Sequence, residues 1–132
     1  MFLNLLSEKE GKNFLQLATI AMKVNGIIEE REKAVFQTYR LELGIHDYKL
    51  QNKELTDLVT AFQASTKKVK RAIIIELSGV LNADEEIDIA EENWILKLGN
   101  EWGFRDSEVR KMIRWAQDFN DLLAEGYEYI NK

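Results

Sequence analysis

The chain has 132 residues, of which 45% are hydrophobic and 31% are charged, and it contains neither proline nor cysteine. This composition excludes collagen-like and disulfide-stapled proteins, and it predicts one globular domain over residues 1–132 that can bury a full core without a cofactor. The formal net charge of −5 disfavours nucleic acids and anionic membranes as partners, because both are polyanions. We therefore expect the chain to bind cations or basic proteins.

The first residues and the apolar runs bear on where the protein is found. Residues 1–10 lack the basic start, the apolar stretch and the cleavage site of a signal peptide. The longest aliphatic cluster is residues 72–75, far short of the roughly 20 residues that span a bilayer. These features predict a cytoplasmic protein without a transmembrane segment.

Apolar residues recur at helical spacing along most of the chain. Near the C-terminus the pattern runs through Val109, Met112, Ile113, Ala116, Phe119 and Leu123. Ser7 followed by Glu10 marks a helix start, and Gly44 and Gly103 mark helix ends. Together these signals predict an all-α protein, with six helices at residues 7–24, 29–43, 50–63, 66–82, 88–102 and 107–130. The three tryptophans share this spacing and are expected to pack in the core or in a groove and not to form a ligand cage: Trp94, Trp102 and Trp115.

The sequence contains an internal repeat. Residues 14–45 align without a gap with residues 73–104, at an offset of 59, and matched positions share residue class. The alignment preserves a helix, a polar turn, a second helix and a final glycine, which is the pattern of an αα-hairpin used twice. We therefore predict a compact helical bundle of about six helices built from two pseudo-symmetric hairpins that pack face to face.

The polar turn of each copy resembles a known family motif. Residues 25–32 read Asn-Gly-Ile-Ile-Glu-Glu-Arg-Glu, and residues 84–91 read Asp-Glu-Glu-Ile-Asp-Ile-Ala-Glu. Both are similar to the Asp-Gly-x-Ile-x-x-x-Glu signature of the TerB-like family, which is named for tellurite resistance and is also found beside DnaJ-type co-chaperone domains. Each copy departs from the signature once, at Asn25 and at Glu85. The resemblance, which covers about residues 14–104, implies an all-helical binding or stress-response module.

The resemblance also implies a shared acidic patch that binds a divalent cation. The matching positions are Asn25, Glu29, Glu32, Asp84, Asp88 and Glu91. Hard cations such as Ca²⁺, Mg²⁺ or Mn²⁺ suit these residues, because they prefer oxygen ligands. An EF-hand starting at Asn82 is excluded, since its sixth and twelfth positions would be Ile87 and Asn93. The alternative is that the acidic residues only cap helices, because Asp88 and Glu91 have the spacing of a capping box.

Acidic residues are concentrated between Ala72 and Leu96, a stretch with seven carboxylates and no Lys or Arg. This unneutralised charge predicts that a basic protein segment binds around Glu85, Glu86 and Glu92. The basic clusters at residues 67–71 and 105–114 are interpreted as solvated helix faces, because neither has the interleaved aromatics of a nucleic-acid site.

Side chains suited to catalysis are few. His46 is the one histidine, and most of the four serines have the positions of helix caps. We therefore expect a binding module and not an enzyme. The alternative, an enzyme, would require a deep pocket that joins His46 or a serine to carboxylates with shifted pKa values.

Overall fold

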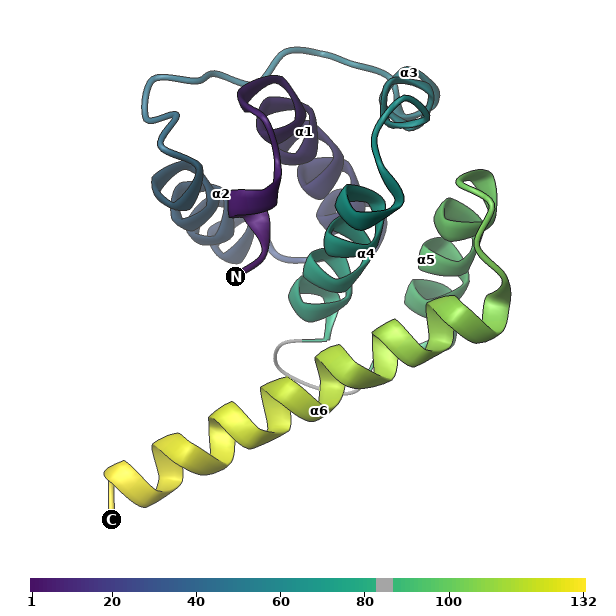
Figure 1. Cartoon of the computed structure of the whole chain (residues 1–132). Helices are drawn as coiled ribbons and strands as arrows, with labels where there is room; N and C mark the ends of the chain where they lie inside the picture. The colour runs from purple at the N-terminus through teal and green to yellow at the C-terminus, as the bar shows by residue number, and fades with distance from the viewer. Residues whose placement is uncertain (83–86) are drawn as a thin grey trace. The chain divides into compact units, whose positions relative to one another are not determined.

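The computed structural model describes residues 1–82 and 87–132. The described residues form six α-helices and a short 3-10 helix and contain no strand (Figure 1). The elements are η1 (Leu3–Leu5), α1 (Glu8–Val24), α2 (Glu29–Leu43), α3 (Leu55–Phe62), α4 (Lys67–Leu81), α5 (Ile89–Glu101) and α6 (Asp106–Ile130). The predicted all-α fold class is confirmed, and five of the six helices begin and end within one residue of the predicted bounds.

The chain divides into two compact units, Met1–Ile73 and Ile74–Lys132, and the division falls inside α4. The single domain over residues 1–132 and the face-to-face packing of two hairpins stay predictions. Among the helices described, none combines the length and the apolar character needed to cross a membrane.

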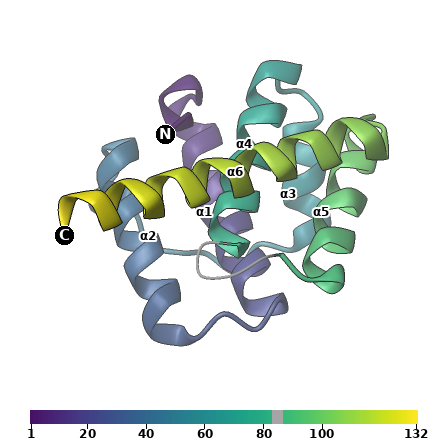
Figure 2. The same cartoon turned by 90° about the horizontal axis from the view of Figure 1, so that it is seen from below.

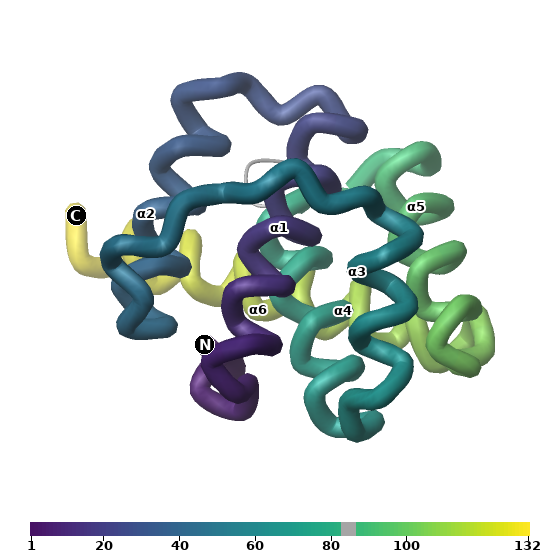
Figure 3. The backbone as a smooth tube through the Cα atoms, turned by 90° about the horizontal axis from the view of Figure 1, so that it is seen from above, coloured from purple at the N-terminus to yellow at the C-terminus, as the bar shows by residue number. Residues whose placement is uncertain are grey.

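Helix α1 is the central helix of the first unit. Both α2 and α3 pack on α1, and α2 also contacts η1. In Figure 3, α2 and α3 lie on opposite sides of α1, and the segment after α2 crosses over α1 to reach α3. A capping box starts α1: Glu10 N donates to Ser7 Oγ (3.2 Å), and Ser7 N donates to Glu10 Oε1 (2.9 Å). Neighbours on two sides leave α1 with the largest share of buried residues among the helices of this unit.

A tight turn folds α2 back along α1. Gly26 adopts a left-handed conformation (φ 74°) in this turn, a backbone region that glycine enters without steric cost. Within the hairpin, the rings of Phe14 and Tyr39 meet edge to face, with centroids 5.0 Å apart and planes at 79°. After α2, Gly44 is again left-handed, and the N–H of Ile45 donates to the carbonyl of Arg40 (3.1 Å).

Helix α3 is shorter than predicted, because it begins at Leu55 and not at residue 50. The segment before it must span α1, and an extended residue advances about 3.3 Å where a helical residue advances about 1.5 Å. Polar side chains fix this segment to α1: Lys53 Nζ donates to Asn13 Oδ1 (2.9 Å), and Gln16 Nε2 donates to Tyr48 OH (2.7 Å). Residues 50–54, which the helical spacing predicted to belong to α3, therefore form part of the segment that crosses α1.

In the second unit, α5 and α6 pack as a pair. Gly103 (φ 86°) ends α5, and the N–H of Phe104 donates to the carbonyl of Gly99 (3.0 Å). The two helices approach closely at Gly99, where an added Cβ would lie 2.5 Å from Val109 Cγ2. In Figure 2, α6 starts beside the end of α5, runs at a large angle to it and continues well beyond it.

Several structural features of the two copies of the repeat also lie 59 residues apart. The starts of α1 and α4 are 59 residues apart, as are the left-handed glycines that follow α2 and α5. The hydrogen bond from Ile45 to Arg40 has its counterpart, at the same offset, in the bond from Phe104 to Gly99. The starts of the first helices and the glycines after the second helices therefore match at this offset, whereas the superposition of the two hairpins stays a prediction.

Candidate functional site

The first acidic turn lies where α1 meets α2. Asn25 Nδ2 donates to a backbone carbonyl of α1 (2.7 Å), so this amide group caps its own helix. Glu29 Oε1 lies 3.2 Å from Lys33 Nζ, and Glu32 Oε1 lies 3.7 Å from Lys23 Nζ. The Glu29 side chain is exposed, whereas that of Glu32 is only 15% exposed. Both predicted ligand carboxylates of this turn, Glu29 and Glu32, thus have a lysine counter-ion within the first unit.

The second acidic turn starts α5. Glu91 N donates to Asp88 Oδ1 (2.7 Å), and Asp88 N donates to Glu91 Oε1 (3.0 Å), which confirms the capping box. Glu91 is 8% exposed. Asp84, Glu85 and Glu86 lie outside the described residues. Capping engages one oxygen of each carboxylate, so it does not decide whether the same residues hold a cation.

The six predicted ligands are divided between the two units, with Asn25, Glu29 and Glu32 in the first and the other three in the second. Their joint site therefore stays a prediction. Within residues 1–82 and 87–132, no group of three or more His, Cys, Asp or Glu side chains is placed to hold a metal ion.

Glu92 was predicted to belong to an unneutralised acidic surface. In the second unit, Arg110 Nε of α6 donates to Glu92 Oε1 at 3.0 Å. The stretch from Ala72 to Leu96 has no Lys or Arg of its own, but the packing of α6 on α5 supplies one. Part of the predicted acidic field is therefore neutralised from a distant part of the sequence.

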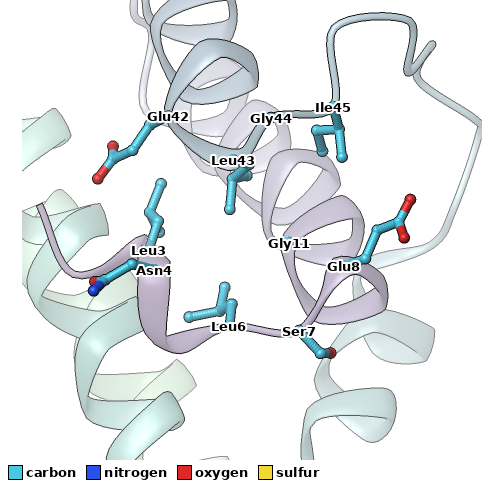
Figure 4. Close-up of a pocket in the computed structure, with 10 residues that line it drawn as sticks. All are labelled: Leu3, Asn4, Leu6, Ser7, Glu8, Gly11, Glu42, Leu43, Gly44 and Ile45. Atoms are coloured by element: carbon cyan, nitrogen blue, oxygen red, sulfur yellow. The ribbon is translucent and has the colours of Figure 1, made fainter.

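A pocket of about 400 Å³ lies in the first unit, where η1 and the start of α1 face the end of α2 (Figure 4). In Figure 4 the side chains of Leu3, Leu6 and Leu43 point into the space between these elements, while that of Glu8 points away from it. Leucine side chains thus enter a pocket whose lining also includes polar residues, among them Asn4, Ser7 and Glu42.

The side chains considered for catalysis lie in surroundings that suit a structural role. His46 is exposed and lines a second pocket of about 560 Å³ together with Glu8, Lys12 and Asp47. Glu10 is a carboxyl with a shifted pKa: burial raises its pKa, but hydrogen bonds from Ser65 and Ser7 lower it and prevail. A lowered pKa keeps this carboxylate ionised, which suits a hydrogen-bond acceptor and not a general acid.

Sequence reasoning located the second half of α6 but missed that this half is exposed. Val109, Ile113 and Ala116 are buried, but no residue of α6 beyond Ala116 is buried. Residues 117–130, named here the distal segment, continue the helix for about four turns. Phe119 is half-buried, and the other large apolar side chains of this segment are exposed: Leu122, Leu123, Tyr127, Tyr129 and Ile130. The helical spacing of Phe119 and Leu123 had indicated an amphipathic helix, but not which part of it is covered.

The tryptophans divide between core and surface. Trp102 is buried, as predicted, whereas Trp115 is 44% exposed. The ring of Trp115 stacks on that of Phe119, with centroids 5.5 Å apart and planes at 15°. Trp115 therefore extends the exposed apolar surface of the distal segment and does not fill the core.

The distal segment is also strongly acidic. It contains four carboxylates, Asp118, Asp121, Glu125 and Glu128. There is no Lys or Arg between Trp115 and Asn131. Within the part of the chain that the structure describes, none of the four carboxylates forms an ion pair. The lack of basic residues between Arg114 and Lys132 is the sequence signal that could have indicated this surface.

Comparisons of the chain with protein-family models, curated proteins and solved structures found no significant match. The likeness to the TerB-like family thus rests on the two turn motifs alone and stays a prediction. The described side chains are the basis for a functional assignment.

Proposed function

We propose that the chain is a non-enzymatic binding module of the TerB-like type, which recruits a basic protein segment in the cytoplasm as part of a stress response. The four distal carboxylates, which have no ion-pair partner within the described residues, carry this proposal. Such carboxylates attract a basic partner without first breaking an internal pair. By contrast, Glu29 and Glu92 already have counter-ions from their own unit.

Binding of a fluorescently labelled, Lys-rich peptide tests the recruitment of a basic segment. We expect the peptide to bind at low salt, and its affinity to fall by about tenfold or more once the Debye length drops to about 8 Å. A peptide with Glu in place of every Lys is the matched control and should not bind. The proposal is wrong if the Lys-rich peptide does not bind at low salt, or binds with an affinity that ignores ionic strength.

A divalent cation site at the acidic turns is the second candidate function. The observation in its favour is that Glu32 and Glu91, which match at the offset of 59, both have side chains that are largely shielded from water. A carboxylate held in place by its surroundings loses less conformational entropy when it binds a cation than a mobile one does. Ca²⁺, Mg²⁺ and Mn²⁺ are the cations to test.

Thermal unfolding with and without each cation, at fixed ionic strength, tests this site. A cation at about 100-fold its Kd should raise the Tm by about 5–10 °C. The double substitution Glu32→Gln and Glu91→Gln should remove the shift, and glutamine keeps the capping box of α5. The control is Glu125→Gln with Glu128→Gln, which should leave the shift unchanged. A Tm that does not respond to any of the cations, or an equal shift in the Glu32/Glu91 variant, contradicts the site.

A further inference from the structure

We infer that the distal segment of α6 docks an amphipathic helix of a partner protein, with an apolar stripe and a row of Lys or Arg along one edge. The inference rests on the proposed function, because it specifies the surface and the shape of the basic segment. Three features of the described residues carry it: the apolar stripe, the position of the carboxylates beside it, and the length of helix that lacks buried residues.

The apolar residues of the distal segment share one face of the helix. Phe119, Leu123 and Ile130 follow each other at intervals of four and seven residues, which is the spacing of a seam between two helices. Leu122, at 66% exposed, and Ile130, at 77% exposed, are among the most exposed large apolar side chains of the molecule. A contiguous apolar stripe of this kind, bordered by charge, is typical of a helix-binding surface.

The carboxylates border the stripe on one side only. At about 100° per residue, Asp118 and Glu125 follow the edge formed by Leu122 and Tyr129, with Asp121 and Glu128 next to them. The opposite edge, beside Tyr127, has no charged residue. The partner helix should therefore have its basic residues along a single edge, because only that edge meets carboxylates.

The negative charge of the distal segment decides which kind of molecule fits its apolar stripe. Two distal segments packed antiparallel would oppose their acidic edges, and opposed like charges are destabilising, whereas parallel packing would leave both acidic edges without a cationic partner. An anionic membrane surface would repel the same carboxylates. A basic amphipathic helix matches both the apolar stripe and the acidic edge, and so it is the occupant to which we commit.

The length of the distal segment supports a helical partner. An isolated helix of about four turns is marginally stable in water, and packing of an apolar face is what normally stabilises one. Within the second unit, packing on α5 ends near Ala116, Asn120 Nδ2 donates to the carbonyl of Gly79 (3.2 Å), and none of the residues 121–130 is buried. A partner helix along the stripe would bury their apolar face by knobs-into-holes packing.

The experiment compares designed peptides on the full chain by fluorescence anisotropy. The first peptide is helical, with Leu at heptad spacing and Lys along one edge of the Leu face. The second has the same composition in an order that scatters Leu around the helix. We expect the first to bind about tenfold or more tightly than the second, a difference of about 1.4 kcal/mol.

Paired substitutions in the chain locate the surface. Leu123→Ser with Ile130→Ser should weaken the first peptide about tenfold or more, and Asp118→Asn with Glu125→Gln should weaken it and reduce its salt dependence. The matched controls alter exposed residues elsewhere: Val24→Ser with Leu41→Ser, and Asp57→Asn with Glu54→Gln. Both controls should bind within about twofold of wild type, which is about 0.4 kcal/mol.

The possible outcomes separate this inference from the proposed function. If both peptides bind equally well, and the Leu123/Ile130 variant binds like wild type, the chain recruits basic segments but the stripe is not the docking surface. If neither peptide binds, the proposed function fails as well. If wild type self-associates in sedimentation and the Leu123/Ile130 variant does not, the occupant is a second copy and the inference is wrong.

Discussion

Helices α1 and α6 are both long and amphipathic, but their surroundings differ. In α1, residues on several faces are buried, because α2 and α3 pack on it from opposite sides (Figure 3). In α6, burial is limited to Val109, Ile113 and Ala116, where the helix contacts α5. Apolar residues keep the same helical spacing through Leu123 to Ile130. Helical periodicity therefore indicates which face is apolar, whereas the neighbouring elements determine what covers it.

The largest expected effect compares leucines of the two helices. Leu17 of α1 is fully buried, and Leu122 of α6 is exposed. Leu17→Ala should lower the free energy of unfolding by about 2–5 kcal/mol, because it removes apolar contacts and leaves a cavity. Leu122→Ala should change it by no more than about 0.5 kcal/mol. Urea unfolding of both variants checks the contrast, and a large loss for Leu122→Ala would show that the distal segment is covered in the free protein.

Two glycine-to-alanine substitutions test the difference between the two halves of α6. An alanine Cβ at Gly99 would collide with Val109 in the first half, whereas Gly126 in the second half has open space around it. We expect Gly99→Ala to cost about 1–3 kcal/mol, since the stiff Val109 side chain must move. Gly126→Ala should instead stabilise by up to about 1 kcal/mol through helix propensity. Thermal unfolding measures both, and equal Tm values for the two variants would contradict the close approach of α5 and α6.

The smallest effect concerns the start of α1, which has a charged network that the end of α6 lacks. Ser65 Oγ donates to Glu10 Oε2 (2.5 Å), and this bond and those from Ser7 hold the pKa of Glu10 below its ordinary value despite burial. Ser65→Ala should cost about 1 kcal/mol at neutral pH. Because the folded pKa is lowered, this contribution is present above the ordinary pKa of glutamate and is lost as the pH falls through the lowered value.

Urea unfolding of wild type and Ser65→Ala at neutral and at acid pH checks this dependence. The difference between the two proteins should shrink as Glu10 becomes protonated. A difference that stays the same at both pH values would show that the hydroxyl acts without the carboxylate charge.

Local signals in the sequence were sufficient to locate the helices. Ser7 with Glu10, and Asp88 with Glu91, form the capping boxes that their spacing predicts. Gly44 and Gly103 adopt the left-handed conformation that ends a helix. These features depend on residues within one turn of each other, so their physics is contained in a short stretch of sequence.

The candidate site was less predictable, because its chemistry depends on residues far apart in sequence. The neutralisation of Glu92 by Arg110 requires α6 to pack on α5. The shortened α3 follows from the path across α1, which Lys53 and Asn13 stabilise. Neither contact can be recognised from a local sequence pattern, because each joins segments that are separated along the chain. The spacing of apolar residues gives no information about which segments meet.

By itself, the sequence determined the all-α class, the helix ends and the acidic character of the chain, because backbone hydrogen bonds, caps and net charge are local or additive properties. Only the tertiary structure decided which apolar stripe is buried and which is left exposed. Burial depends on the neighbour that a face meets, so α1 became a central helix while the distal segment of α6, with the same kind of spacing, kept its apolar side chains at the surface.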